Sequence, residues 1–331
     1  MKEGDLLLCH FYKWYCFGVL ISSQKPNSAR KERHFMSGPL LIALAAALWA
    51  LDGVVRRGLY HLPPVTIVFY EHLIGSLILL PIVVRTLKQE KFTKKLLLTS
   101  LIVALFGGLL GTLFITTALM KVNYISFSVI FLIQKIQPLF AIASAGFLLG
   151  ERINKKYLSW ALLAIIAVFF VTFPNGNVNL DTGPDTLVAA LYALGAAACW
   201  GFGTTLSKLL LNQVKKSSSA TILRFYLSTV LSYIAIFVLG SQNSLDSLVG
   251  KDFIALIYIA LSTGLLAMII YYKGLQKTQA KVATIMEMTL PLLAVVVDMI
   301  LYKSFLATSQ YLAALVLMYA MYKISQLNKI Q

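Results

Sequence analysis

The sequence predicts an all-α integral membrane protein with ten transmembrane helices. Of its 331 residues, 59% are hydrophobic and only 13% are charged, and the mean hydropathy is +0.79. A soluble domain usually carries about 25% charged residues, so this composition argues against a water-soluble enzyme. The apolar residues also fall into runs of roughly 20 residues, the length that a helix needs to cross a bilayer.

Ten apolar runs meet this requirement, and short connections join them. The predicted spans are residues 38–59, 64–84, 96–119, 126–149, 157–173, 186–206, 219–239, 253–272, 282–301 and 306–321. The longest polar connections, residues 174–185 and 240–252, leave no room for a soluble domain.

The basic residues predict the orientation of the chain. Most of the 29 Lys and Arg residues lie in the N-terminal segment, the C-terminal tail and the even-numbered connections. Because cytoplasmic loops collect Lys and Arg, we expect both termini in the cytoplasm. The net charge of +16 therefore indicates basic cytoplasmic loops, and we expect no nucleic-acid partner.

Residues 1–37 form a leader before the first span, and two interpretations of it stand. Residues 6–22 are apolar but contain His10 and Lys13, and no small-residue cleavage site follows them, which argues against a signal peptide. The leader is either an interfacial helix or not native, in which case Met36 is the true start. An eleventh span is disfavoured because it would turn the N-terminus outward.

The two halves of the sequence resemble each other. The segment AALWALDGVVRRGL around Trp49 matches AACWGFGTTLSKLL around Trp200. Further along, Pro138 in QPLFAIA matches Pro291 in LPLLAVV. Chance similarity between segments rich in Leu and Ala is the alternative, but the landmarks recur in the same order.

An internal repeat with five spans in each copy has a structural consequence. An odd number of spans turns the second copy upside down relative to the first. Inverted repeats are typical of secondary transporters, in which the substrate binds near the midplane between the halves. We therefore expect two inverted five-helix repeats, residues 38–173 and 186–321, around a central cavity, followed by a cytoplasmic tail, residues 322–331.

The sequence resembles the EamA branch of the drug/metabolite transporter superfamily. The resemblance rests on the five-plus-five arrangement, the Trp in spans one and six, an ALxK turn at residues 118–121, the mid-span prolines and the LLGERI string at residues 148–153. It covers residues 38–326 and implies a ten-helix inner-membrane carrier, often an exporter of amino acids or other metabolites. The sequence departs from the family in having LYKSF at residues 301–305 in place of the second ER, and Glu71 where many relatives have Arg.

Charged residues inside the spans are the first candidates for a site, because each costs about 2.5–3.5 kcal/mol in the bilayer unless it faces a cavity or a partner. Lys135 lies within one turn of Gln134 and Gln137 and just before Pro138, which frees a backbone carbonyl on the preceding turn. We expect this group to form a wall that binds a carboxylate or phosphate. The alternative is a structural ion pair between Lys135 and Glu71.

Glu71 and His72 lie near the centre of span two. Desolvation and a nearby cation act in opposite directions on the protonation of a buried carboxylate, so Glu71 is either a proton carrier or the fixed counter-ion of Lys135. For His72 we favour a hydrogen bond at a helix interface over a proton relay.

Span nine and the two matched tryptophans supply further cavity candidates. Glu287 shares one helix face with Pro291 and Asp298, which predicts a lining for an outward path. Trp49 and Trp200 are too deep for an interfacial belt and either line the cavity symmetrically or pack against other side chains.

Other polar and small residues have structural interpretations. Asp52 and Arg56 are four residues apart, so we expect them to pair along their helix. Arg57 and Arg224 are expected to extend to the membrane interfaces. The GGLLG string at residues 107–111 has the small-residue spacing that lets helices approach closely.

Motifs of other function classes are missing from the sequence. There is no GxxxxGK(S/T) string for ATP and no zinc or esterase motif, and the three cysteines form no disulfide framework. We therefore expect no enzyme activity, cofactor or metal.

The missing ATP motif favours transport driven by a gradient, and the family resemblance implies a secondary transporter in the inner (plasma) membrane that exports small polar metabolites such as amino acids by alternating access. The partners are then a small-molecule substrate and the bilayer, with the protein a monomer or homodimer. The alternative is a non-transporting or lipid-handling membrane protein of the same fold.

Overall fold

The computed structural model describes residues 37–59, 61–121, 133–178, 185–302 and 306–328. The chain divides into two units, Met1–Phe35 and Met36–Gln331, and the description here concerns the second. The leader and the first part of the span expected at residues 126–149 lie outside the described residues, so the two interpretations of the leader stay predictions.

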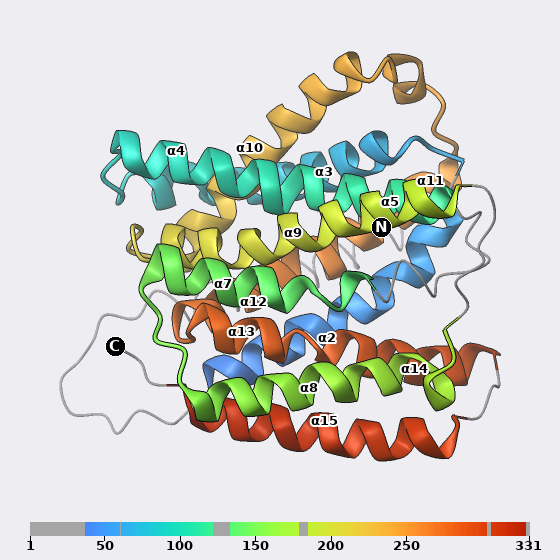
Figure 1. The fold of residues 1–331 in the computed structure, drawn as a ribbon. Helices are drawn as coiled ribbons and strands as arrows, with labels where there is room; N and C mark the ends of the chain where they lie inside the picture. Colours follow the sequence, from blue (N-terminus) through green and yellow to red (C-terminus); the bar gives the residue numbers. More distant parts are fainter. Residues whose placement is uncertain (1–36, 60, 122–132, 179–184, 303–305, 329–331) are drawn as a thin grey trace, which may run out of the picture. The chain divides into compact units, whose positions relative to one another are not determined.

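The described residues form helices and no strand (Figure 1). In chain order the elements are α2 (Gly38–Arg56), η1 (Arg57–Leu59), α3 (Pro64–Leu87), α4 (Lys94–Val103), η2 (Ala104–Leu110), α5 (Gly111–Lys121), α7 (Gln137–Leu149), α8 (Lys155–Thr172), η3 (Pro174–Gly176), α9 (Thr186–Leu211), α10 (Ser217–Val238), η4 (Gln242–Leu245), α11 (Gly250–Tyr258), η5 (Ile259–Leu266), α12 (Ala267–Gln276), α13 (Ala280–Met286), α14 (Thr289–Tyr302) and α15 (Thr308–Gln326).

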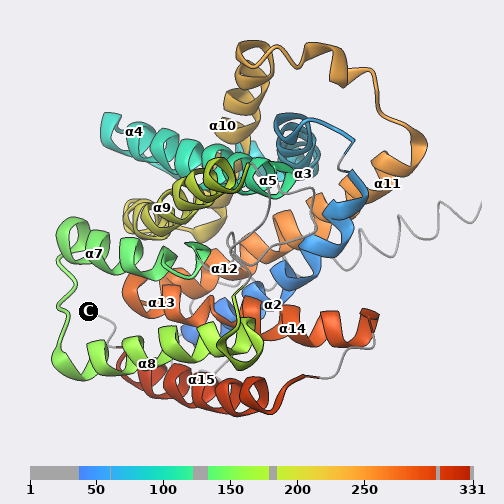
Figure 2. The ribbon, with the colours of Figure 1, turned by 45° about the vertical axis from the view of Figure 1, so that its right-hand side comes forward.

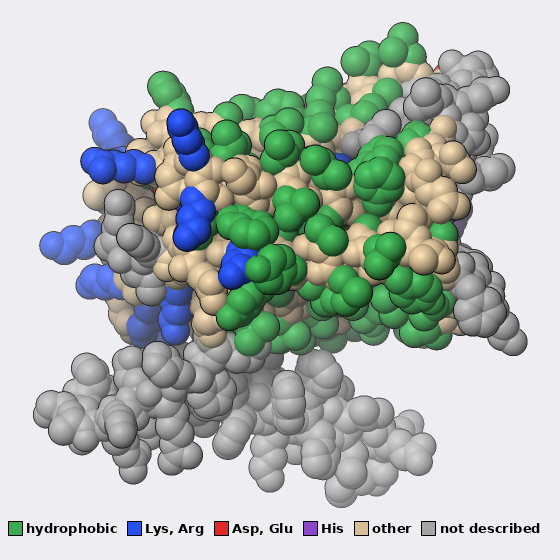
Figure 3. Space-filling model, turned by 60° about the horizontal axis from the view of Figure 1, so that its bottom comes forward, with side chains coloured by type: hydrophobic (Ala, Val, Ile, Leu, Met, Phe, Trp, Pro, Cys, Tyr) green, Lys and Arg blue, Asp and Glu red, His purple; other side chains and the backbone are tan. Residues whose placement is uncertain are grey.

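Seven helical stretches in the described residues are long and apolar enough to cross a membrane. They are Pro64–Leu87, Lys94–Lys121, Lys155–Thr172, Leu187–Leu211, Ser217–Val238, Gly250–Gln276 and Ala280–Val297, and shorter apolar helices cover Gly38–Asp52 and Gln137–Leu149. Large apolar side chains such as Phe147, Leu187 and Ile254 are exposed on their outer faces. Figure 3 shows hydrophobic side chains over much of one face and most of its Lys and Arg side chains near one end. Such a surface suits lipid flanked by water.

Local sequence explains where several helices begin and end. The Thr93 side chain accepts a hydrogen bond from the backbone N–H of Leu96 at the start of α4, and Asn154 does the same for Tyr157 at the start of α8. Gly150 ends α7 with φ of 65°, a conformation that other residues rarely adopt.

The two halves of the chain pack against each other throughout. Helix α3 packs on α10, α8 on α15, α2 on α12, α5 on α9, α7 on α9, and α14 on α2. Figures 1 and 2 both show α8 and α15 side by side. The contacts come in matched sets, since α2 with α12 corresponds to α9 with α5, and α7 with α9 corresponds to α14 with α2. Helices at equivalent positions in the two sequence repeats thus make equivalent contacts.

Irregular backbone recurs at matched places in the two halves. The stretch Lys94–Lys121 contains the π-helical segment η2, and the stretch Gly250–Gln276 contains the π-helical segment η5. The helix is also interrupted at residues 135–136, before α7, and at residues 287–288, between α13 and α14. The sequence predicted uninterrupted spans at these places. Pro138 explains the first interruption, because it is the second residue of α7, where a helix needs no backbone N–H donor.

Two glutamates from the first half bind the starts of helices in the second half. The buried Glu90 carboxylate accepts hydrogen bonds from the backbone N–H of Lys215 (3.0 and 3.1 Å) and from the Ser219 hydroxyl (2.6 Å), just before and within α10. The Glu151 carboxylate accepts from the backbone N–H groups of Ala280 (2.6 Å) and Lys281 (3.0 Å) at the start of α13. Negative charge is favoured at helix N-termini, so both contacts fasten one half to the other.

Replacing Glu90 by Ala should lower the free energy of unfolding by about 1–3 kcal/mol, because buried donors on α10 lose their acceptor. Thermal unfolding of the purified protein in detergent measures the change. Gln89→Ala is the matched control, since Gln89 is exposed just after α3 and, among the described residues, its side chain donates only to the Arg85 carbonyl oxygen at the end of that helix. Equal melting temperatures for the two variants would contradict the stabilising role of Glu90.

Close packing of α9 on α7 gives a second stability prediction. A Cβ added at Gly201 would lie 2.7 Å from the Gln137 carbonyl oxygen and 3.1 Å from the Ala141 nitrogen. Because backbone atoms cannot move aside easily, Gly201→Ala should cost about 1–3 kcal/mol. Gly250→Ala is the control, since no atom lies within 4 Å of its added Cβ. A Gly201→Ala variant as stable as Gly250→Ala would show that α9 and α7 pack less closely.

Candidate functional site

A cavity of about 330 Å³ lies among the helices of both halves, and its volume is in the range of small-molecule sites. Helices of the first half (α2, α3, η2, α5, α7) and of the second (α9, α10, η5, α12, α13, α14) contribute to its wall. Every site candidate from the sequence lines it: Trp49, Asp52, Arg56, Glu71, Gln134, Lys135, Gln137, Pro138, Trp200, Glu287 and Pro291. The side chain of Asp298 lies outside the described residues.

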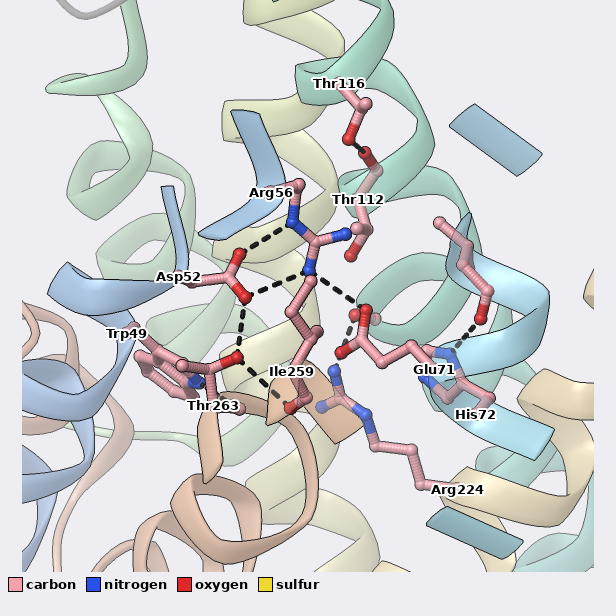
Figure 4. Close-up of polar contacts among 12 residues, drawn as sticks. Trp49, Asp52, Arg56, Glu71, His72, Thr112, Thr116, Arg224, Ile259 and Thr263 are labelled. Atoms are coloured by element: carbon pink, nitrogen blue, oxygen red, sulfur yellow. Dashed lines mark hydrogen bonds and ion pairs between the residues drawn. The ribbon is translucent and has the colours of Figure 1, made fainter. Parts of the chain in front are cut away.

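One wall of the cavity is built around the buried guanidinium of Arg56. Its Nε lies 2.7 Å from Asp52 Oδ2, and its Nη2 lies 3.0 Å from Glu71 Oε2. The Thr263 hydroxyl of η5 donates to Asp52 Oδ1 (2.6 Å). Figure 4 shows Asp52, Arg56 and Glu71 pointing toward one another. A buried charge is stable only with partners of this kind.

The pairing of Asp52 with Arg56 agrees with the four-residue spacing, but the pairing of Glu71 differs from the expectation. Glu71 has Arg56, and not Lys135, as its counter-ion. Lys135 lies in the cavity wall at the interruption before α7. One feature of the sequence is consistent with this pairing, since Asp52 and Arg56 lie in the first predicted span and Glu71 lies in the second.

Trp49 fastens α2 to the second half. Its indole N–H donates to the Thr263 carbonyl oxygen (2.9 Å), within the π-helical segment η5. Its ring also lies against that of Tyr271 on α12, with centroids 5.2 Å apart. Trp200 lies against Gly111, the first residue of α5 directly after η2, since a Cβ added at Gly111 would clash with its indole ring. Both tryptophans therefore line the cavity and pack closely.

The expectation that Arg224 extends to the membrane interface is wrong. Its Nη2 donates to the Gly107 carbonyl oxygen (2.6 Å) and its Nη1 to the Tyr272 hydroxyl (3.4 Å), within the cavity wall. The π-helical segment η2 includes Gly107, and the missing side chain leaves room for the guanidinium. The side chain of Arg57 lies outside the described residues.

Opposite charges occupy equivalent positions in the two halves. Glu71 is the eighth residue of α3, and Arg224 is the eighth residue of α10. Glu71 lies against Gly264 of η5, and Arg224 lies against Gly107 of η2. Gly264 thus leaves space for the Glu71 side chain, and Gly107 leaves space for the Arg224 side chain.

His72 also differs from the expectation of a bond between helices. Its Nδ1 lies 2.8 Å from the Val68 carbonyl oxygen of its own helix, one turn earlier, and its ring lies 5.3 Å from that of Phe225. Among the described residues, His72 therefore contacts α10 by packing of its ring against that of Phe225 and not by a hydrogen bond.

Glu287 is held by three neutral donors. Its Oε1 accepts from the Tyr271 hydroxyl (2.7 Å) and the Thr204 hydroxyl (3.2 Å), and its Oε2 accepts from the Gln137 side-chain amide (3.1 Å). Glu287 and Gln137 were expected from the sequence, but Tyr271 and Thr204 were not. No sequence pattern marks these two, because their relation to Glu287 arises only from the packing of α9 and α12.

The chemistry of the cavity is that of a binding site. Aromatic rings and methionines alternate with amides, hydroxyls and charged groups, and the acids Asp52, Glu71 and Glu287 are all hydrogen-bonded within the protein. In the described part of the chain, no group of three or more His, Cys, Asp or Glu side chains is placed to hold a metal ion.

Comparison with known proteins finds a matching family and similar transporters. The model of the EamA-like transporter family matches residues 36–173 and 187–326. The riboflavin transporter ImpX of Fusobacterium nucleatum is 35% identical over 300 residues, which are 88% of this chain and 99% of that protein. An uncharacterized transporter of Clostridium kluyveri is 23% identical over 268 residues, 80% of this chain and 85% of that protein.

A solved crystal structure has the same fold, with a TM-score of 0.69 over 88% of this chain and 97% of the other, at 16% identity. The packing of the two halves around a shared cavity agrees with the two matches of the family model, one in each half. The protein is thus a multi-pass membrane transporter that belongs to the EamA-like transporter family.

Proposed function

We propose that this protein is a secondary carrier of riboflavin or a closely similar flat aromatic metabolite. The observation that carries the proposal is the similarity to a riboflavin transporter, 35% identical over 88% of this chain and 99% of that protein. Absence of an ATP motif from the sequence favours transport driven by a gradient. The substrate enters from one side of the membrane and leaves on the other as the two halves move relative to each other.

The proposed architecture is ten transmembrane helices in two inverted repeats, residues 38–173 and 186–321, with a leader at 1–37 and a tail at 322–331. The matched packing of the halves, the two π-helical segments and the two helix interruptions support a repeat. Five spans in each copy require the inversion. The basic connections favour the inner membrane with both termini in the cytoplasm.

The cavity suits a neutral molecule that is flat and aromatic at one end and polar at the other. Trp49, Trp200 and Tyr271 contribute aromatic rings to the wall, and the amides of Gln134 and Gln137 can both donate and accept hydrogen bonds. A riboflavin ring system presents alternating donors and acceptors along one edge, and its chain carries hydroxyl groups. Because Asp52 and Glu71 already form ion pairs with Arg56, an uncharged substrate does not have to compensate these three buried charges.

Export of amino acids is the second candidate. The observation that favours it is the presence of Lys135 and Glu287 in the wall of one cavity, since an amino acid needs groups of both signs. It is the weaker candidate because the Glu287 carboxylate already accepts hydrogen bonds from three protein groups.

Transport into proteoliposomes discriminates among these functions. We expect saturable uptake of radiolabelled riboflavin that excess unlabelled riboflavin inhibits and amino acids do not. Loading riboflavin or amino acids inside the vesicles measures flux in the other direction. Amino-acid flux without riboflavin flux would establish the second candidate, and no flux of either kind would favour a non-transporting or lipid-handling protein.

The aromatic wall gives a prediction for binding. Trp200→Ala should weaken riboflavin binding about 5- to 150-fold, because stacking of a nucleobase on an aromatic side chain contributes about 1–3 kcal/mol. Quenching of riboflavin fluorescence by the purified protein measures the dissociation constant. Trp160→Ala is the matched control, since Trp160 packs on Tyr319, away from the cavity. Equal dissociation constants for the two variants, with both still folded by thermal unfolding, would remove Trp200 from the site.

A further inference from the structure

One of the three acids in the cavity wall differs from the other two. Asp52 and Glu71 form ion pairs with Arg56, at 2.7 and 3.0 Å. Glu287 accepts hydrogen bonds from neutral groups, and it has no ion pair with any described residue. Protonation of Asp52 or Glu71 would leave a buried guanidinium with less compensation, whereas protonation of Glu287 breaks no ion pair.

The hydrogen bonds of Glu287 suit both the carboxylate and the carboxyl form. Oε1 faces the hydroxyls of Tyr271 and Thr204, and a hydroxyl can either donate or accept. Oε2 faces the side-chain nitrogen of Gln137, which can only donate. When Oε1 carries a proton, its O–H can therefore donate a hydrogen bond to the Thr204 oxygen, once the Thr204 hydroxyl has rotated. Oε2 meanwhile keeps its hydrogen bond from Gln137.

The position of Glu287 connects its protonation to the arrangement of the halves. It lies at the interruption between α13 and α14, and its three partners come from α7, α9 and α12. Gln137 belongs to the first half, and Thr204 and Tyr271 to the second. A change in the charge of Glu287 therefore acts at a contact between the halves, beside the proposed substrate.

Other titratable or charged groups near Glu287 have their own contacts. The cavity wall also carries Asp52, Arg56, Glu71, His72, Lys135, Arg224 and Tyr271, and only Tyr271 among them hydrogen-bonds to Glu287 in the described part of the chain. On helices that pack against α13, Lys208 donates to two backbone carbonyls of α12, and Lys323 lies over the Tyr319 ring. Tyr157 of α8 donates to the Lys281 carbonyl oxygen.

We propose that Glu287 is the proton-binding site that couples transport to the proton gradient. The inference rests on the proposed function. The carboxylate takes a proton from the aqueous medium on the side to which the cavity is open, and becomes a neutral carboxyl. When the halves rearrange and the cavity opens to the other side, the proton leaves to that medium and the carboxylate is restored. One proton moves per cycle.

Transport with and without a pH gradient tests the coupling. For one proton per neutral substrate molecule, a pH difference of about one unit supports up to about tenfold accumulation, since tenfold corresponds to about 1.4 kcal/mol. We expect this accumulation in the wild type and in Glu287→Asp, and its loss in Glu287→Gln. The rate at which Glu287→Gln exchanges labelled for unlabelled riboflavin should not change with pH, whereas the rate of the wild type should.

Asp246→Asn is the matched control, because Asp246 is exposed in a loop, outside the cavity wall. It should accumulate riboflavin as the wild type does. Gradient-driven accumulation by Glu287→Gln at the wild-type level would overturn the inference. A wild type that neither exchanges nor accumulates riboflavin would instead contradict the proposed function.

Infrared difference spectroscopy tests proton binding without any substrate. Spectra of the reconstituted protein at acidic minus alkaline pH should contain the C=O stretching band of a buried carboxyl, which Glu287→Gln removes and Asp246→Asn does not. Tyr271→Phe should shift the pH at which this band appears, because one hydroxyl partner of Oε1 is lost. A band that is unchanged in Glu287→Gln would show that the proton binds elsewhere.

Discussion

A charge buried among membrane-spanning helices is tolerated only with partners, and this constraint organises the centre of the protein. Arg56 has to be compensated, and it draws Asp52 of its own helix and Glu71 of α3 to the same point. Thr263 of η5 then binds Asp52 from the other half of the chain. The ion pairs and the Thr263 hydrogen bond thereby hold α2, α3 and η5 together at one wall of the cavity.

Irregular helices are the second requirement of such a centre. Within a regular helix, most backbone carbonyls already accept a hydrogen bond from an N–H of the same helix. The π-helical segments η2 and η5 offer the carbonyls of Gly107 and Thr263 to Arg224 and Trp49. The interruption at Glu287 likewise places a carboxylate between helices of both halves. Part of the cavity wall therefore comes from places where the helices depart from ideal geometry.

Hydropathy and spacing predicted the helices well and the contacts between them poorly. The span expected at 219–239 corresponds to α10 (Ser217–Val238), and the predicted site residues whose side chains are described line the cavity. Spacing along one helix identified the pair of Asp52 with Arg56, since both partners share a face. It did not identify the partner of Glu71, the place of Arg224, or the hydroxyls around Glu287, because helix periodicity does not specify which helix faces which. The π-helical segments were also missed, since their residues are as apolar as those around them.

The most direct test of this account is a double-mutant cycle on Arg56 and Glu71, read by thermal unfolding in detergent. Arg56→Met leaves two buried carboxylates without compensation and should destabilise the protein strongly, by about 3–5 kcal/mol. Adding Glu71→Gln should recover part of that loss, with a coupling energy of about 1–3 kcal/mol. The parallel cycle on Lys135 and Glu71 should give a smaller coupling. Additive effects of Arg56→Met and Glu71→Gln would contradict the central role of this ion pair.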